Sequence, residues 1–194
     1  MNLKFVTVVL ILLAVASFTL VAQGEESTEP EAAQAPEPGS APSTIMTGES
    51  LNALIKSIDP EASREGNASQ FMFQERLMLV VFDEAADRMR LFSPIGPTGL
   101  LDAEKVQRML QANFDSALDA RYAVANNLVW GIFIHPLSPL DENEFASAIV
   151  QVYNVAESFG STYTSGLATY GGGDSVEENR KLLEELKKRI NPTT

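Results

Sequence analysis

The sequence lacks several of the residues on which enzyme and metal chemistry depend. Its 194 residues include no cysteine and a single histidine, His135. Without cysteine the chain can form no disulfide, no thiolate nucleophile and no cysteine-ligated zinc or iron–sulfur site. A single histidine excludes a metal site built on a histidine pair and leaves one candidate for histidine acid–base chemistry.

Basic residues are also few, since 14 Lys and Arg stand against 26 Asp and Glu and give a formal net charge of −12. A protein that neutralises nucleic-acid phosphates needs clustered Lys and Arg, so nucleic acid is excluded as an expected partner. Hydrophobic residues make up 45% of the chain and charged residues 21%. These proportions indicate a globular domain with additional segments, because a disordered chain has fewer apolar residues.

An apolar segment follows Lys4 at the N-terminus, where residues 5–22 form an almost unbroken hydrophobic run that ends on small residues. A basic start, an apolar middle and a small-residue end are typical of a secretory signal peptide. We therefore predict a signal peptide over residues 1–24, cleaved after Ala22 or Gly24, and an exported chain that is periplasmic or secreted. The alternative is a membrane anchor formed by residues 5–22, because a run of about 18 apolar residues can begin to span a bilayer.

Residues 25–44 are predicted to form a disordered linker. They contain five Glu, four Pro and many Ala and Ser, but no large apolar side chain. Such a segment cannot bury enough surface to offset the entropy lost on ordering. Proline and like charge keep a linker extended, so this one is expected to tether the domain that follows.

Residues 45–166 are predicted to form one α+β domain with an antiparallel five-stranded sheet and helices packed on one face. Strands joined by short turns imply antiparallel pairing, and the helical segments between them are then gathered on one side. Apolar residues that recur about every 3.6 residues indicate helices, and apolar residues that recur every 2 residues indicate strands. These patterns give the order α-β-β-β-α-β-β-α. The expected elements are a helix at 50–59, strands at 71–74, 77–82 and 88–91, a helix from 102, strands at 121–125 and 128–135, and a helix from 141.

Local patterns predict the bounds of several elements. Residues 61–69 are expected to form a polar loop, and Pro94, Gly96 and Pro97 are expected to break the chain after the third strand. Asp141 with Glu144 three residues later is the pattern of a helix capping box. The second helix is predicted from a cap at Asp102 and from apolar residues at helical spacing: Val106, Leu110, Phe114 and Ala117.

A Gly-rich linker over 167–173 is predicted to precede a C-terminal amphipathic helix over 174–190. Leu183, Leu186 and Ile190 form a narrow apolar stripe on this otherwise charged helix. Three alternatives remain open for the stripe: docking on the domain, pairing with a partner helix, or staying mobile.

Several groups of residues are similar to a known family. They are 79–83 leading into 88–95, the helix around Leu110 to Phe114, the strands 121–125 and 128–134, and Pro136 and Leu140 followed by the helix from Glu142. Together with the order of elements over roughly residues 46–160, they resemble the type III secretion chaperone fold, which includes Tir-chaperone-like proteins, and its YbjN-type relatives, which are sensory transduction regulators. The resemblance implies a homodimer without catalysis whose surfaces hold an extended segment of a protein partner. Family chaperones act in the cytoplasm, whereas this chain resembles an exported variant.

The candidate chemistry is sparse. His135 precedes Pro136 at the end of an apolar strand, and no partner for acid–base catalysis is indicated. The acidic turn of Asp83, Glu84 and Asp87 lacks the glycine and the terminal glutamate of an EF-hand loop. The chain has no G-x-S-x-G nucleophile motif, and Gly171–Gly173 is not followed by the lysine of a phosphate-binding loop. We therefore predict no catalytic residue, no metal and no cofactor.

The predicted function is that of an exported, non-enzymatic protein-binding domain that associates with itself and holds a partner segment. Trp130 and Phe133 lie in a strand that is apolar on both faces, so they are either core or, if exposed, a dimer or partner surface. The candidate partner-binding residues are Trp130, Phe133, Leu183, Leu186 and Ile190. One alternative is a membrane-anchored, YbjN-like sensory or envelope-stress regulator. An uncharacterised hydrolase is the alternative of another class.

Overall fold

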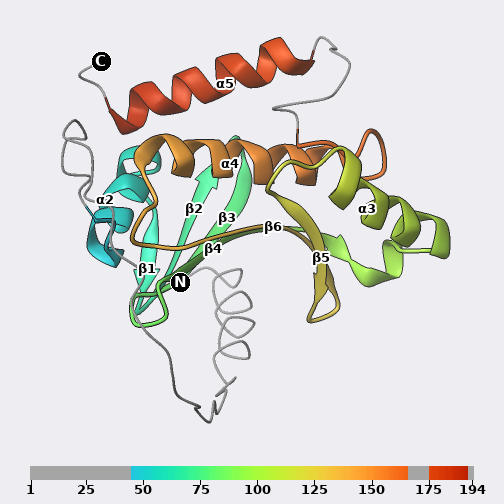
Figure 1. Cartoon of the computed structure of the whole chain (residues 1–194), viewed down its shortest axis with the longest axis horizontal. Coiled ribbons are helices and arrows are strands. Elements are labelled where there is room, and N and C mark those ends of the chain that lie inside the picture. Colours follow the sequence, from blue (N-terminus) through green and yellow to red (C-terminus); the bar gives the residue numbers. More distant parts are fainter. Residues whose placement is uncertain (1–44, 166–174, 192–194) are drawn as a thin grey trace, which may run out of the picture. The chain divides into compact units, whose positions relative to one another are not determined.

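The computed structural model describes residues 45–165 and 175–191, with only the backbone described for residues 175–179. Figure 1 shows helices over a curved sheet. The elements are α2 (Gly48–Ile58), β1 (Ser63–Glu65), β2 (Ala68–Phe73), β3 (Arg76–Asp83), β4 (Arg88–Pro97), the short 3-10 helix η2 (Thr98–Leu100), α3 (Ala103–Asp115), β5 (Arg121–Ala125), β6 (Leu128–His135), α4 (Glu142–Glu157) and α5 (Ser175–Ile190). The predicted signal peptide and both predicted linkers lie outside these residues.

The strands form one sheet in the order β1-β2-β3-β4-β6-β5, and every neighbouring pair is antiparallel. This confirms the predicted α+β class and antiparallel pairing, but the prediction of five strands is wrong. The sixth strand is β1, which pairs with β2 around a turn at Gly66, a glycine with a φ of 58°. Its three residues, Ser63–Glu65, are all polar and show no apolar alternation, so the sequence contains no strand pattern there.

Strand β4 continues through Pro94 to Pro97, where the sequence was expected to break. The pairing of β4 with β3 ends at Leu79↔Phe92, so the residues beyond Phe92 pair with β6 alone. A register shift between Pro94 and Gly96 marks a bulge. Proline is tolerated at such a place because one of its sides has no neighbouring strand that needs its N–H.

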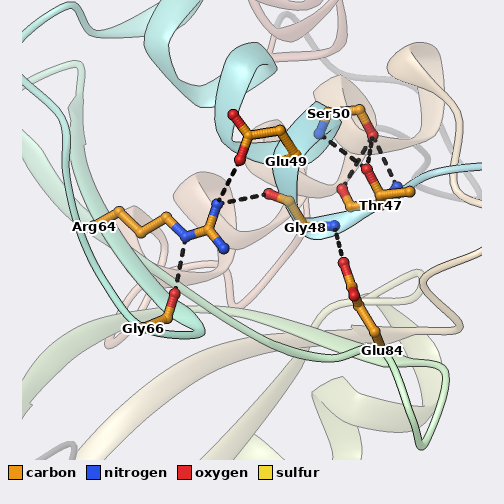
Figure 2. Close-up of polar contacts among 7 residues, drawn as sticks. All are labelled: Thr47, Gly48, Glu49, Ser50, Arg64, Gly66 and Glu84. Carbon is orange, nitrogen blue, oxygen red and sulfur yellow. Dashed lines mark hydrogen bonds and ion pairs between the residues drawn. The ribbon is translucent and has the colours of Figure 1, made fainter.

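Helix α2 begins at a capping box, as Figure 2 shows. The Thr47 side chain accepts a hydrogen bond from the Ser50 backbone N–H, and the Ser50 side chain accepts one from the Thr47 N–H. The Gly48 N–H donates to Glu84 Oε1 at 2.7 Å, which connects the start of the helix to the turn between β3 and β4. A carboxylate at this position is favourable because the N-terminus of a helix is partly positive.

Arg64 of β1 holds the same region from the other side (Figure 2). Its guanidinium donates to the carbonyl oxygens of Gly48 and Gly66, pairs with Glu49 at 3.3 Å and lies 5.1 Å from the centre of the Phe82 ring. Position 48 must be glycine because a Cβ there would lie 2.1 Å from the Phe82 ring. The contacts therefore fix α2 against one face of the sheet.

Helix α4 covers the centre of that same face. Its capping box of Asp141 and Glu144 is present as predicted. At Gly131 of β6 the helix comes so close that a Cβ would lie 3.2 Å from the Val152 carbonyl oxygen. The core is formed between this face and the helices; its largest fully buried side chains include Phe71, Met78, Met89, Leu91, Phe145 and Ile149.

Helix α5 packs against α4 and α2, so within the described residues the C-terminal stripe docks on the domain. Leu186 and Ile190 are buried and belong to the core, while Leu182 and Leu183 are partly buried against it. In the described part of the chain, no helix combines the length and apolar character needed to cross a membrane.

Candidate partner-binding surfaces

Helix α3 exposes three of the four apolar residues that predicted it, whereas the fourth, Ala117, is buried beyond the end of the helix. Val106, Leu110 and Phe114 are 40%, 66% and 92% exposed, and we call these three residues the α3 stripe. The buried residues of the helix are Met109 and Ala112, on its other side. The helix and its Asp102 cap are confirmed, but its apolar periodicity marks a face directed away from the sheet. Three further exposed apolar residues occur near it in the chain: Leu100, Leu118 and Val124.

Polar contacts hold α3 in this orientation. The Asn113 side chain accepts a hydrogen bond from the Tyr122 N–H at 2.7 Å and donates to the Tyr122 carbonyl oxygen at 3.1 Å. These two bonds occupy the backbone N–H and carbonyl groups of Tyr122 in the edge strand β5. At the end of the helix, Ser116 Oγ donates to the Tyr163 carbonyl oxygen at 2.6 Å. The exposed side chains of the α3 stripe are therefore presented by a fixed helix.

An open depression of about 590 Å³ lies beside the α3 stripe. It combines two apolar side chains with charges of both signs, and Arg108 lies 3.6 Å from Asp115 there. Such a surface offers apolar contact with a polar margin, which is the usual composition of a protein–protein interface. Its lining residues are Gln107, Arg108, Leu110, Gln111, Phe114 and Asp115.

A second apolar surface lies on the side of the sheet opposite α4, which we call the outer sheet face. Residues alternate between the two faces of a strand, and the register places five partly or largely exposed apolar residues of β3, β4 and β6 on the outer side. None of them belongs to the core formed under the helices or packs against it. In the described ranges, no α-helix lies over this face (Figure 1). The five residues are Leu77, Val81, Phe92, Ile132 and Ile134.

The polar groups considered for chemistry have structural partners instead of converging. His135 Nδ1 lies 2.7 Å from the Pro136 carbonyl oxygen and its Nε2 lies 4.0 Å from Glu144 Oε1. In the acidic turn, Asp83 accepts from the Ala86 N–H. No group of three or more His, Asp or Glu side chains that could hold a metal occurs among the described residues.

The other two carboxylates of that turn connect distant elements. Glu84 accepts from α2 as described above, and Asp87 accepts from the Ser138 N–H at 2.6 Å and the Ser138 hydroxyl at 2.9 Å. The hydrogen bonds from Ser138 lower the pKa of Asp87 below its ordinary value of 3.8. The arrangement stabilises an ionised carboxylate in a structural contact with Ser138.

A buried polar contact joins α4 to the start of β5. Gln151 Oε1 accepts from the N–H groups of Asp119 and Ala120 at 2.9 and 3.1 Å. The Tyr122 hydroxyl donates to the Val155 carbonyl oxygen at 2.8 Å, and burial raises the pKa of Tyr122 to about 12. A tyrosine so difficult to ionise is suited to packing, not to acid–base chemistry near neutral pH.

The five predicted partner-binding residues do not form one exposed surface. Phe133, Leu186 and Ile190 lie in the core, and Leu183 packs against it. Trp130 is buried on the outer sheet face, with its ring edge-to-face on Phe92 at 5.5 Å and its Nε1 donating to the Ala125 carbonyl oxygen. Their role in partner binding stays a prediction. The α3 stripe was missed as a surface because a helical apolar period does not tell which way the stripe faces.

No protein-family model and no curated protein matches the chain. Solved structures that are similar include the Yersinia pestis type III secretion chaperone SycH in complex with a stable fragment of YscM2. Its identity is 13% and its TM-score 0.43, over 55% of this chain and 97% of that chain. A chain of the ExsC–ExsE complex matches at 13% identity and a TM-score of 0.47, over 58% of this chain and 92% of that chain. The first belongs to the class that the sequence resembles. The Tir-chaperone-like or YbjN-type subtype stays a prediction, and we infer function from the surfaces of the chain itself.

Proposed function

We propose that the chain is an exported, non-enzymatic protein-binding domain that associates with a second copy and holds a segment of a partner protein. The supporting observation is the α3 stripe, in which Phe114 is 92% exposed on a helix that is fixed by Asn113 and Ser116. Burying a phenylalanine or leucine side chain contributes about 1.5–3 kcal/mol, so an apolar stripe left in water favours association. Export is proposed from the apolar N-terminal run alone.

A second copy suits the α3 stripe because a two-fold interface places one surface against itself. The stripe is apolar at its centre, and Arg108 and Asp115 give its margin one charge of each sign. Two antiparallel stripes can therefore bury their apolar residues while each arginine approaches the carboxylate of the other copy. A partner segment would bind elsewhere on the same domain.

Light scattering of the full chain with Leu110→Ser and Phe114→Ser combined tests this proposal. We expect the unchanged chain to show twice the mass of one chain and the double variant to show the single mass. Both side chains are exposed, so the free energy of unfolding per chain should change by less than about 0.5 kcal/mol. Ile45→Ser, at another exposed apolar residue, is the matched control and should leave the mass unchanged. A single mass for the unchanged chain at every concentration would contradict self-association through α3.

The membrane-anchored regulator is the second candidate, and the length of the apolar run at residues 5–22 favours it. N-terminal sequencing of the chain from the cell envelope separates the two. A first residue near Gly24 or Glu25 supports export with cleavage, whereas a chain that keeps its N-terminus and sediments with membranes supports the anchor.

A further inference from the structure

The outer sheet face combines apolar side chains with two arginines that form no ion pair within the described part of the chain. Arg88 and Arg90 alternate with the buried Met89 and Leu91 along β4, so both point to the outer side. Both are exposed, and neither forms an ion pair with a carboxylate in the described part of the chain. The Arg88 guanidinium donates to the Asp87 carbonyl oxygen at 3.3 Å, and, in addition to the hydrogen bonds described above, its charge contributes to lowering the pKa of the Asp87 carboxyl.

The register places Arg90 inside the apolar surface, not at its margin. Its direct neighbours are Val81 on β3 and Ile134 on β6, and Phe92 follows on the same side of β4. Ile134 is 54% exposed, and Met72 at the β2 edge of the same face is 48% exposed. A guanidinium among apolar groups is well placed to bind a carboxylate, because it presents several donors in a planar fork and is less strongly hydrated than an ammonium.

We propose that the outer sheet face binds an extended partner segment that carries both apolar and acidic side chains. Its apolar side chains would pack on Phe92, Ile132 and Ile134, and its carboxylates would pair with Arg88 and Arg90. This inference rests on the proposed function, since it names the partner segment that the domain holds. The charges support an acidic segment: the chain has a net charge of −12, yet the centre of this face carries unpaired positive charge.

A second copy is a poorer occupant of this face than an acidic segment. It would bring the same two arginines to the contact, and the carboxylate beside them, Asp83, already lies opposite Arg88 in the register without forming an ion pair. Like charges facing each other across an interface weaken it. The α3 stripe has charges of both signs at its margin and is the surface assigned above to the second copy.

The fluorescence of Trp130 can report binding to this face, because Trp130 is the only tryptophan of the chain and lies on this face against Phe92. The full chain would be titrated with a peptide of alternating leucine and glutamate, and separately with one of alternating leucine and lysine, while Trp130 fluorescence is recorded. We expect the glutamate peptide to give a saturable change with a dissociation constant about tenfold lower than that of the lysine peptide. Attraction by the net charge alone would give the opposite order.

Arg90→Gln should weaken binding of the glutamate peptide about tenfold and leave the mass of the chain in light scattering unchanged. Lys105→Gln, at an exposed basic residue of α3, is the matched control and should bind as the unchanged chain does. Equal or tighter binding of the lysine peptide, or no binding of either peptide, would overturn the inference. A change of Trp130 fluorescence with protein concentration alone would also overturn it, in favour of a second copy on this face. Light scattering of the α3 double variant tests the proposed function separately, so the two can fail independently.

Discussion

The two faces of the sheet both carry apolar side chains but have different surroundings. On one face, Phe71, Met78 and Leu91 are buried under α2 and α4 in a single core. On the outer sheet face, Phe92 and Ile132 are only partly buried, and no α-helix of the described residues lies over them. The comparison teaches that the same strands supply stability on one side and a surface for contact on the other.

The polar and charged side chains of the two faces also differ in their hydrogen bonds and ion pairs. On the covered side, the buried Gln151 accepts hydrogen bonds from the N–H groups of Asp119 and Ala120. On the outer side, Arg88 and Arg90 are exposed and form no ion pair with the carboxylates of the described residues. A surface that contacts only water can carry charged side chains at any position. Charged side chains that lie among apolar ones instead favour a partner with the opposite charge.

The largest expected effect is a difference in stability between substitutions at two neighbouring residues of β2. Phe71→Ala should lower the free energy of unfolding by about 3–5 kcal/mol, because the phenylalanine is buried in the core and its removal leaves a cavity. Met72→Ala, on the other face of the same strand, should cost less than about 1 kcal/mol. Denaturant unfolding followed by Trp130 fluorescence measures both. Equal costs would mean that the outer sheet face is as fully packed as the covered one.

A second prediction concerns the close approach of β6 to α4. Gly131→Val should cost about 1–3 kcal/mol, because even a Cβ at this position would lie 3.2 Å from the Val152 carbonyl oxygen. Ile132→Val, at the next residue and on the outer face, is the control and should change stability by less than about 1 kcal/mol. Thermal unfolding of the two variants provides the comparison. If Gly131→Val is neutral, α4 is not held against the sheet as described.

A third prediction is a gain in stability at Asn154 of α4. Its side-chain Nδ2 is buried and has no hydrogen-bond partner, which is costly in an apolar environment. Asn154→Leu should therefore raise the free energy of unfolding by about 1 kcal/mol. Denaturant unfolding measures the gain, and a loss of stability instead would show that the amide has a partner that the variant removes.

The smallest expected effect is the dependence of stability on pH through Asp87. Hydrogen bonds from Ser138 lower its pKa below the ordinary value of 3.8, so the folded chain binds this proton less tightly than the unfolded chain. The stabilisation is thus fully present above about pH 3.8 and is lost as pH falls through the lower folded-state value. Unfolding measured between neutral and acid pH should show a shallower loss for Asp87→Asn. Identical acid profiles would mean that the contact with Ser138 is absent in solution.

Much of the fold could be predicted because caps and apolar periods are local. Asp102 and Asp141 cap their helices as expected, and the strands predicted at residues 121–125 and 128–135 form an antiparallel pair. Strand β1 could not be predicted because its three polar residues are held by pairing with β2, which is a tertiary contact. The bulge at Pro94 likewise depends on the neighbouring strand.

The candidate surfaces were harder to predict than the elements. The period of Val106, Leu110 and Phe114 is compatible with either a buried or an exposed stripe, and only the packing of Met109 and Ala112 decides between them. Trp130 and Phe133 are three residues apart in a strand, so alternation already places them on opposite faces. Their opposite orientations could therefore have been predicted. The position of Arg90 among apolar side chains could not, because it depends on the strand register that places Val81 and Ile134 beside it.

The most direct test of the account is oxidative footprinting of the full chain at low and high protein concentration. Phe114 reports on the α3 stripe and Met72 on the outer sheet face, and both are exposed in a single chain. We predict that the reactivity of Phe114 falls as concentration rises while that of Met72 stays constant until a partner segment is added. Unchanged reactivity of Phe114 at every concentration, with a mass of one chain throughout, would contradict the claim that this domain works through contact with other protein chains at α3.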